Sequence, residues 1–217
     1  SGTLWTPPTM DDTQARRATT GEVLWQAGRT VTATADTRTT AAVHHGKVYL
    51  AHPEGLTVRW ADTGVVDWQL QTNSTANFGD SNPGSPIVYK GVLYAPFRTS
   101  GDWRLVAIDV DPSSTTYQMI LWESTGLVDR AYGTPAAASD RVYIVDFEGR
   151  LRAYDAATGA TLWQQTLGSQ VETTEALSLA AMPPAVLVTG TDGNLRAFSA
   201  ADGHSLWTVF TGSRLTS

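Results

Sequence analysis

The histidines and aspartates are the side chains best suited to acid–base or metal chemistry in this sequence, and none has a catalytic spacing. His44 and His45 are adjacent. Neighbouring side chains on a strand point to opposite faces, so we interpret the pair as solvent-facing turn residues, not ligands of one metal. Asp109 and Asp111 lack the glycine and downstream carboxylate of a calcium loop, which favours turn capping. His204 is expected at the surface.

Composition excludes several classes of function. The 217 residues contain no cysteine, which rules out a cysteine nucleophile, disulfides and thiolate metal sites. The formal net charge is -6, and Lys47 and Lys90 are the only lysines, so neither nucleic acid nor an anionic membrane surface is an expected partner. The sequence contains no run of about eighteen apolar residues, so no transmembrane helix is predicted. No Gly-x-Ser-x-Gly elbow or Walker-type glycine loop occurs.

The stretch from Arg141 to Trp163 is a repeat unit that the rest of the chain copies. Two strands meet at Glu148-Gly149, and the turn Asp155–Gly159 joins the second of them to an outermost strand that begins near Trp163. Aspartate favours the first position of a type I turn, and Gly159 can supply the left-handed residue that closes the hairpin. The unit therefore predicts consecutive antiparallel strands.

Tryptophans recur along the chain at intervals of roughly 40 to 55 residues, close to the length of a four-stranded propeller blade. One copy is disguised, because the longer segment Val110–Tyr117 replaces its turn. Each tryptophan is expected to wedge between the outer strands of adjacent blades. The residues expected to hold blades together are Gly21, Trp25, Gly64, Trp68, Trp122, Gly159, Trp163, Gly203 and Trp207.

The strands are apolar on both faces, as in Val48–Ala51 and Val142–Val145. Both faces must then be buried, which a blade packed between two neighbours achieves. We therefore predict an all-β propeller of four-stranded antiparallel blades. A solenoid or a large sandwich is the alternative, but neither predicts a tryptophan and a Thr-Gly turn at this interval.

The predicted blades divide the chain into one domain or arc. A partial blade covers residues 1–28, and four complete blades cover 29–72, 73–124, 125–168 and 169–212. The partial blade lacks its innermost strand. An open arc leaves unpaired edges, which proteins usually close or cover. We therefore expect the chain to be an excerpt of a larger closed ring of seven or eight blades.

From these residues a family resemblance emerges. The pattern of Leu151–Asp155, followed by Thr158–Trp163, closely resembles the tryptophan-docking repeat of the PQQ-repeat, or quinoprotein alcohol dehydrogenase-like, β-propellers. Five copies extend the resemblance over nearly the whole chain. Only the fourth blade carries the full motif, because Arg17, Trp60 and Ser199 replace its aspartate elsewhere and the third blade replaces its turn.

The resemblance implies three alternative functions. The family includes calcium-dependent PQQ dehydrogenases, the non-catalytic scaffold of outer-membrane protein assembly, and extracytoplasmic sensor propellers of bacterial protein kinases. Its dehydrogenases use a vicinal cysteine pair, a tryptophan, calcium ligands and a catalytic aspartate. Since cysteine is absent, no cofactor is expected. PQQ and calcium belong only to the alternative of a dehydrogenase fragment whose ligands lie elsewhere.

Binding is therefore expected at the loops of one propeller face, because long loops on a rigid scaffold carry binding residues. These loops are Gln26 to Arg38, Gln71 to Gly84, Ser124 to Gly133 and Gly168 to Ala176, with the turn Arg98 to Trp103. Exposed aromatic and arginine side chains are frequent interface anchors. The candidates are Phe78, Asp80, Arg98, Trp103, Arg130 and Tyr132. Phe78 and Tyr132 have an alternative role in closing contacts between blades.

We expect a non-enzymatic binding or assembly scaffold, with a protein or small ligand at this face, in the periplasm or at the cell surface of a bacterium. A dehydrogenase fragment would reduce an electron acceptor when given PQQ and calcium. A receptor sensor would bind a small ligand at the channel mouth.

Overall fold

The described part of the chain consists of β-strands and the turns and loops that connect them. The computed structural model describes residues 3–6, 12–28, 39–52, 55–71, 84–99, 102–124, 127, 133–168, 177–179 and 184–212. Within these ranges no helix is long and apolar enough to cross a membrane.

The strands form five antiparallel sheets, called blades one to five, in which consecutive strands are hydrogen-bonded neighbours. Blade one has three described strands and each other blade has four, as the repeat predicts. Blades one and two comprise β1 (Thr3–Thr6), β2 (Asp12–Arg17), β3 (Val23–Gly28), β4 (Ala42–His44), β5 (Lys47–His52), β6 (Gly55–Trp60) and β7 (Val66–Gln71). Blade three comprises β8 (Ile87–Tyr89), β9 (Val92–Thr99), β10 (Asp102–Asp109) and β11 (Ile120–Glu123). Blades four and five comprise β12 (Ala136–Ala138), β13 (Arg141–Val145), β14 (Arg150–Asp155), β15 (Thr161–Thr166), β16 (Leu177–Leu179), β17 (Ala185–Thr189), β18 (Asn194–Ser199) and β19 (Ser205–Phe210).

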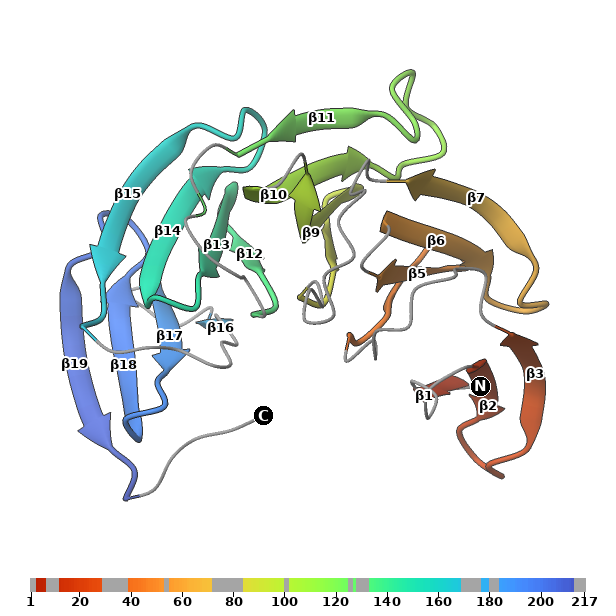
Figure 1. Ribbon diagram of the computed structural model, residues 1–217, viewed down its shortest axis with the longest axis horizontal. Helices are drawn as coiled ribbons and strands as arrows, with labels where there is room; N and C mark the ends of the chain where they lie inside the picture. Colours follow the sequence, from red (N-terminus) through yellow and green to blue (C-terminus); the bar gives the residue numbers. More distant parts are fainter. Residues whose placement is uncertain are drawn as a thin grey trace.

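The blades are arranged side by side in an open arc (Figure 1). The short innermost strands β4, β8, β12 and β16 follow one another along its inner side, and the strands β3, β7, β11, β15 and β19 form the outer rim. Blades one and five lie at the two ends of the arc. The all-β propeller fold predicted from the repeat is confirmed.

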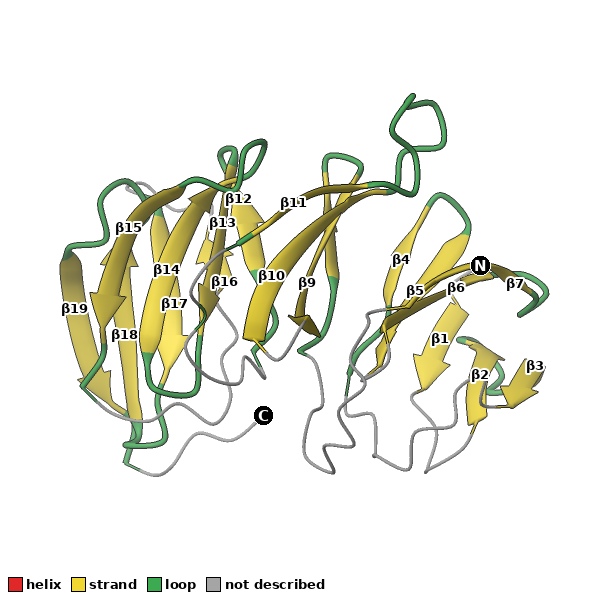
Figure 2. Ribbon diagram, turned by 45° about the horizontal axis from the view of Figure 1, so that its top comes forward, coloured by secondary structure: helices red, strands yellow, loops and turns green. Residues whose placement is uncertain are grey.

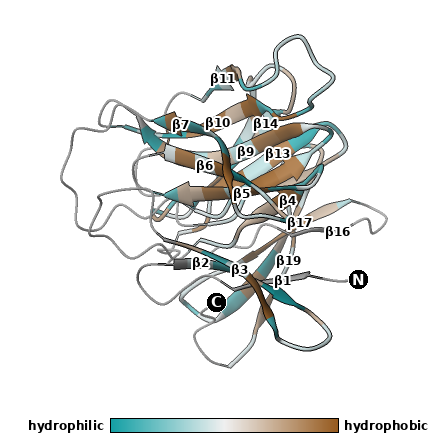
Figure 3. Ribbon diagram, turned by 90° about the vertical axis from the view of Figure 1, so that its right-hand side faces the viewer, coloured by the Kyte–Doolittle hydropathy of each residue, from teal (hydrophilic) through white to brown (hydrophobic). Residues whose placement is uncertain are grey.

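The core consists of apolar layers between neighbouring blades. Tyr143, Val145 and Leu151 of blade four pack against Val186 and Val188 of blade five, and all five side chains are buried. Similar layers lie between blades two and three and between blades three and four. The middle strands β5, β10 and β13 are accordingly mostly hydrophobic (Figure 3). Two buried faces explain why these strands do not alternate between apolar and polar residues.

A shift of register occurs between the third and outermost strand of every blade, as between Ala153 and Tyr154 in blade four. Such a bulge bends the strand and re-aims its side chains. It lies directly beside the outer-strand tryptophan, since Ala153 is paired with Trp163. The bulge therefore sets the direction of the tryptophan ring.

The turns between the third and outermost strands, which we call outer turns, lie at one end of the blades, together with the turns between the first and second strands (Figure 2). The outer turn of blade three extends far beyond the others in this view. The turns between second and third strands, such as the one after Arg98, lie at the opposite end because the strands are antiparallel.

Candidate functional site

Three of the outer-strand tryptophans, Trp25, Trp122 and Trp163, contact the outer turn of the next blade. We call the junction between two neighbouring blades at this position a seam. Trp25 of blade one donates a hydrogen bond from Nε1 to the carbonyl oxygen of Ala61 in blade two, at 2.9 Å. Its ring lies on Gly64, where an added β-carbon would come within 2.5 Å of the ring. Only glycine leaves room there, and its φ of +72° suits glycine equally well.

The seams between blades three and four and between blades four and five repeat this geometry. Trp122 donates to the carbonyl oxygen of Ala156 at 3.0 Å and lies on Gly159. Trp163 donates to the carbonyl oxygen of Ala200 at 3.3 Å and lies on Gly203. Six of the nine residues expected to hold blades together thus contact one another in pairs at three seams, whereas Gly21, Trp68 and Trp207 form no such pair among the described residues.

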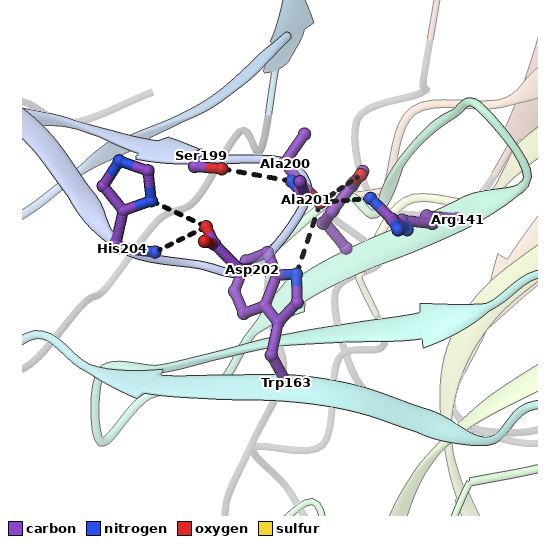
Figure 4. A network of polar contacts seen from close by, with 8 residues as sticks. Arg141, Trp163, Ser199, Ala200, Ala201, Asp202 and His204 are labelled. Atoms are coloured by element: carbon purple, nitrogen blue, oxygen red, sulfur yellow. Dashed lines mark hydrogen bonds and ion pairs between the residues drawn. The ribbon is translucent and has the colours of Figure 1, made fainter.

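The seams between blades three and four and between blades four and five each contain a second hydrogen-bond donor, a tyrosine from the second strand of the preceding blade. The hydroxyl of Tyr94 donates to the carbonyl oxygen of Ala156 at 3.0 Å, and that of Tyr143 donates to the carbonyl oxygen of Ala200 at 3.3 Å. In Figure 4 the side chains of Arg141 and Trp163 converge on the Ala200 carbonyl, to which Arg141 Nη1 donates at 2.8 Å. Backbone oxygens of the outer turns are therefore the acceptors on which adjacent blades meet.

Burial keeps these phenols as donors. The pKa of Tyr94 is raised to about 12, chiefly because burial disfavours the charged phenolate. Burial likewise raises the pKa of Tyr143. Neither hydroxyl is poised as a base near neutral pH, so these tyrosines have a structural role and no geometry for catalysis.

The seam between blades two and three departs from the pattern. Tyr49 and Trp68 occupy the same register positions as Tyr143 and Trp163, yet within the described part of the chain the buried Tyr49 hydroxyl and Trp68 Nε1 have no hydrogen-bond partner. The long outer turn of blade three places Gln118, with a φ of +68°, where other blades have glycine. Its amide donates to the carbonyl oxygen of Asp109, closing the enlarged turn.

A buried lysine joins blades two and three instead. Lys47 is 5% exposed, and its Nζ lies 2.6 Å from Oδ2 of Asp67. It also bonds the hydroxyl of Tyr117 on the long outer turn of blade three. The ammonium lies 4.7 Å from the centre of the Trp60 ring, a cation–π contact. We call Lys47, Asp67, Trp60 and Tyr117 the lysine cluster.

The contacts in the lysine cluster favour the charged ammonium form of Lys47. Burial acts to lower the pKa of Lys47, but the hydrogen bonds to Asp67 and Tyr117 outweigh it and the pKa lies above its ordinary value. A lysine with a lowered pKa could serve as a nucleophile. The pKa of Lys47 is shifted in the opposite direction, and its contacts join blades two and three, so its geometry supports a structural role.

Two of the six binding candidates lie within the described residues. Arg98 and Trp103 face each other across the β9–β10 hairpin. Trp103 is 7% exposed and packs in the apolar layer between blades three and four, with Leu127. It therefore offers little surface to a partner, while Arg98 is half-buried. The other four candidates, Phe78, Asp80, Arg130 and Tyr132, lie outside the described residues.

The aspartates and histidines behave largely as turn residues. Oδ1 of Asp109 accepts a hydrogen bond from the Asp111 amide, and Oδ1 of Asp111 accepts one from the Ser113 amide. His204 is exposed and pairs with Asp202, as the expected surface residue would (Figure 4). His44 differs from the expected solvent-facing residue, because its Nε2 is buried and burial lowers its pKa.

In the described ranges no cluster of three or more histidines or carboxylates could hold a metal ion. The sequence contains no cysteine. The donors that converge at the seams bond backbone carbonyls within the fold.

Comparison with known sequences identifies the family. The sequence profile of the family described as outer membrane protein assembly factor BamB, a PQQ-type repeat, matches residues 10–122 and 119–216. The chain belongs to this family. No protein with a curated description matches the chain in sequence.

Solved structures with this fold include BamB and several dehydrogenases. BamB from Moraxella catarrhalis is 16% identical with a TM-score of 0.77, over 99% of this chain and 62% of that one. A quinohemoprotein alcohol dehydrogenase from Comamonas testosteroni is 13% identical with a TM-score of 0.75, over 96% of this chain and 41% of that one. A europium-containing methanol dehydrogenase is 12% identical with a TM-score of 0.70, over 95% and 49%. The chain thus spans less than two thirds of each of these proteins, and the likeness shows a PQQ-repeat propeller fold.

Sequence reasoning missed two features of the seams. A tyrosine recurs in the second strand of three blades, as Tyr49, Tyr94 and Tyr143, and the last two are donors, so this period was a usable signal. The lysine cluster joins residues from three distant segments, and no spacing in the sequence indicates it. Only the rarity of lysine singles out Lys47.

Proposed function

We propose that this PQQ-repeat propeller is a non-enzymatic assembly scaffold that binds a protein partner in the bacterial cell envelope, outside the cytoplasm. The match of the BamB family profile to both halves of the chain carries this proposal. BamB is described as an outer membrane protein assembly factor. That description supports a partner among envelope proteins.

The geometry supports binding over catalysis. The described polar groups serve seams, turns and the lysine cluster, and no nucleophile and base converge in a cleft among them. Loops carried on a scaffold of packed β-sheets suit recognition of a partner surface. The partner is expected at the end of the blades that carries the Arg98–Trp103 turn.

A site-specific crosslinking experiment tests this proposal. A photoreactive residue at Asp102, which is exposed beside Trp103 at that end, should give a discrete adduct with an envelope protein in living cells. The same residue at Ala157, exposed on an outer turn at the opposite end, serves as the matched control and should give none. Equal adducts from both positions, or none from either, would contradict partner binding at the proposed end.

A second measurement separates the scaffold from a dehydrogenase. The purified chain is mixed with PQQ, calcium and a redox dye over a panel of alcohols. We expect no dye reduction above that of the free cofactor, because the described residues offer no quinone site. Turnover that depends on the protein would refute the non-enzymatic proposal.

A further inference from the structure

The lysine cluster surrounds an ammonium group with the groups that bind organic cations. The Nζ atom of Lys47 lies 4.7 Å from the centre of the Trp60 ring and 5.0 Å from that of the Tyr117 ring. Oδ2 of Asp67 lies 2.6 Å from the same nitrogen. Aromatic faces at such distances attract alkylammonium groups, and a carboxylate adds a charge of opposite sign. We call Trp60, Tyr117 and Asp67 the cation cage.

Two residues of the lysine cluster replace a pair that blade four has at the same place. Lys47 pairs with Trp60 across β5 and β6 in the register in which Arg141 pairs with Asp155 across β13 and β14. Trp60 is 41% exposed and is not among the described residues of the apolar layer between blades two and three. Packing of the core therefore does not account for a tryptophan at this position.

The other two members of the cage are further departures from the repeat. Asp67 stands directly before the outer-strand tryptophan of blade two, where blade four has Leu162. Tyr117 belongs to the long outer turn of blade three, which extends far beyond the others (Figure 2). Departures on two neighbouring blades therefore converge on one ammonium group.

The cage is partly open to solvent, although the lysine inside it is buried. The side chain of Asp67 is 20% exposed, compared with 7% for that of Lys47. The buried Tyr49 hydroxyl, without a partner among the described residues, follows Lys47 by two positions on the same side of β5. The pKa of Tyr49 is raised, first by burial and then by the neighbouring Tyr117 and Asp67. The surroundings of the cage thus include a further polar group that no contact within the described fold uses.

We propose that the cation cage is a binding site for an alkylammonium group from outside the chain, and that Lys47 fills it as a built-in competitor. The incoming cation replaces the Lys47 ammonium, so the charge within the cage is unchanged. A lysine side chain of a partner and a free quaternary amine share this chemistry. The competitor is tethered and acts at an effective concentration of roughly millimolar or more, which lowers the apparent affinity of the cage.

The cage is separate from the proposed scaffold surface. Trp60 is the last residue of β6, next to the outer turn of blade two, and Tyr117 lies on the outer turn of blade three. Both are at the end of the blades opposite the Arg98–Trp103 turn. The inference is therefore independent of the proposed function.

Replacement of each lysine tests the proposal, with Lys90 as the matched control. Tetramethylammonium is titrated into each protein while its methyl resonance is followed by NMR. Lys47→Ala empties the cage and should bind at least about tenfold more tightly than wild type. Lys90 also pairs with an aspartate, Asp140, and lies over the ring of Tyr89, but its side chain is 63% exposed. Lys90→Ala should therefore bind no more tightly than wild type.

A double variant identifies the cage as the place of binding. Lys47→Ala combined with Trp60→Leu should bind about tenfold or more weakly than Lys47→Ala alone, because one aromatic face is lost. Circular dichroism spectra like that of wild type show that the variants are folded. N-acetyl-lysine methylamide is titrated in parallel: tighter binding than that of tetramethylammonium indicates a partner's lysine, and weaker binding indicates a quaternary amine.

The wild-type chain allows a measurement that needs no variant. Lys47 and Lys90 are the only lysines, so acetylation by an N-hydroxysuccinimide ester, followed by peptide mass spectrometry, reports on each separately. Tetramethylammonium chloride should speed acetylation of Lys47 severalfold over sodium chloride of equal ionic strength, and leave Lys90 unchanged. Absence of binding by folded Lys47→Ala, undiminished binding after Trp60→Leu, or an unchanged acetylation rate of Lys47 would each overturn the proposal.

Discussion

At the scale of single residues, the glycines of the turns have two separate roles: they adopt a positive φ, and some of them also leave room for a tryptophan ring. Gly46 and Gly159 have nearly equal φ values of +70° and +71°. A β-carbon at Gly46 would meet nothing within 4 Å, whereas one at Gly159 would lie 2.6 Å from the ring of Trp122. Comparison of substitutions at Gly46 and Gly159 therefore separates the cost of backbone strain from the cost of displacing the tryptophan ring.

Replacement of each glycine by alanine should reveal this difference. Gly46→Ala should lower the free energy of unfolding by about 1 kcal/mol, the cost of a left-handed alanine. Gly159→Ala should lower it by about 2 to 4 kcal/mol, because the Trp122 ring must also move. Urea denaturation followed by circular dichroism measures both, and equal losses would show that the seam does not depend on the bare glycine.

Lys47 gives a second prediction, for alkaline solution. Its pKa in the folded chain lies above the ordinary 10.5, because the bonds to Asp67 and Tyr117 outweigh the effect of burial. The stability that this shift contributes is complete below the unfolded pKa and is lost as pH rises through the folded pKa. Lys47→Met lacks that contribution.

The wild-type chain should therefore lose stability faster than Lys47→Met as the pH rises past the ordinary lysine pKa of 10.5. Urea midpoints at several pH values on either side of it measure the two slopes. Buried tyrosines also destabilise both chains in this range, so the comparison rests on the difference between them. Parallel slopes would contradict the lysine cluster as described.

At the scale of elements, the seams are not equivalent. Tyr94 and Tyr49 hold the same position in successive blades, but the Tyr94 hydroxyl donates to the Ala156 carbonyl at 3.0 Å, and the Tyr49 hydroxyl has no partner among the described residues. A buried polar group with a partner adds stability, and one without a partner costs it.

Removal of each hydroxyl should therefore have different effects. Tyr94→Phe should lower the free energy of unfolding by about 1 to 2 kcal/mol, since it also leaves part of the Ala156 carbonyl's capacity unused. Tyr49→Phe should be neutral or stabilising by up to about 1 kcal/mol. Thermal and urea unfolding measure both variants. A large loss in Tyr49→Phe would show that its hydroxyl is bonded in solution.

Much of this element structure was predictable from the sequence. The repeat of the tryptophan and the Thr-Gly turn predicted the four-stranded antiparallel sheets. Local turn chemistry and two-sided apolar strands suffice for that. The repeat did not predict that Gln118 would take the glycine position of blade three, because the long outer turn hides the spacing.

The candidate site was much less predictable. Trp103 and Arg98 are neighbours in a hairpin, but which of them is buried depends on the adjacent blade, which no local pattern reports. Trp103 meets Leu127, the start of a different blade's segment. Residues of this kind follow tertiary packing, so their exposure cannot be derived from the turn that carries them.

At the scale of the whole molecule, the described blades form an array in which each packs against the next along the chain. Stability in such arrays is a sum of blade and seam contributions, so a blade beside an incomplete seam has fewer favourable contacts. Blade four has a regular seam on either side, whereas in the described structure Trp68 of blade two makes no hydrogen bond to blade three.

Backbone amides should therefore exchange with solvent faster in β7, which carries Trp68, than in β15, which carries Trp163. Hydrogen exchange with mass spectrometry measures this order. Uniform protection along the chain would indicate that the arc unfolds as one cooperative unit instead.

The acceptor at each regular seam is a backbone oxygen, as at Ala61, Ala156 and Ala200. A carbonyl is present whatever side chain the residue carries, so no point mutation can delete it. Substitution of that residue therefore keeps the hydrogen-bond acceptor in place. Substitution of the glycine that closes the turn, in contrast, disturbs the contact with the tryptophan. The contact between neighbouring repeats consequently depends on one glycine and one tryptophan. The other residues of the turn can therefore change during evolution and come to bind a new partner.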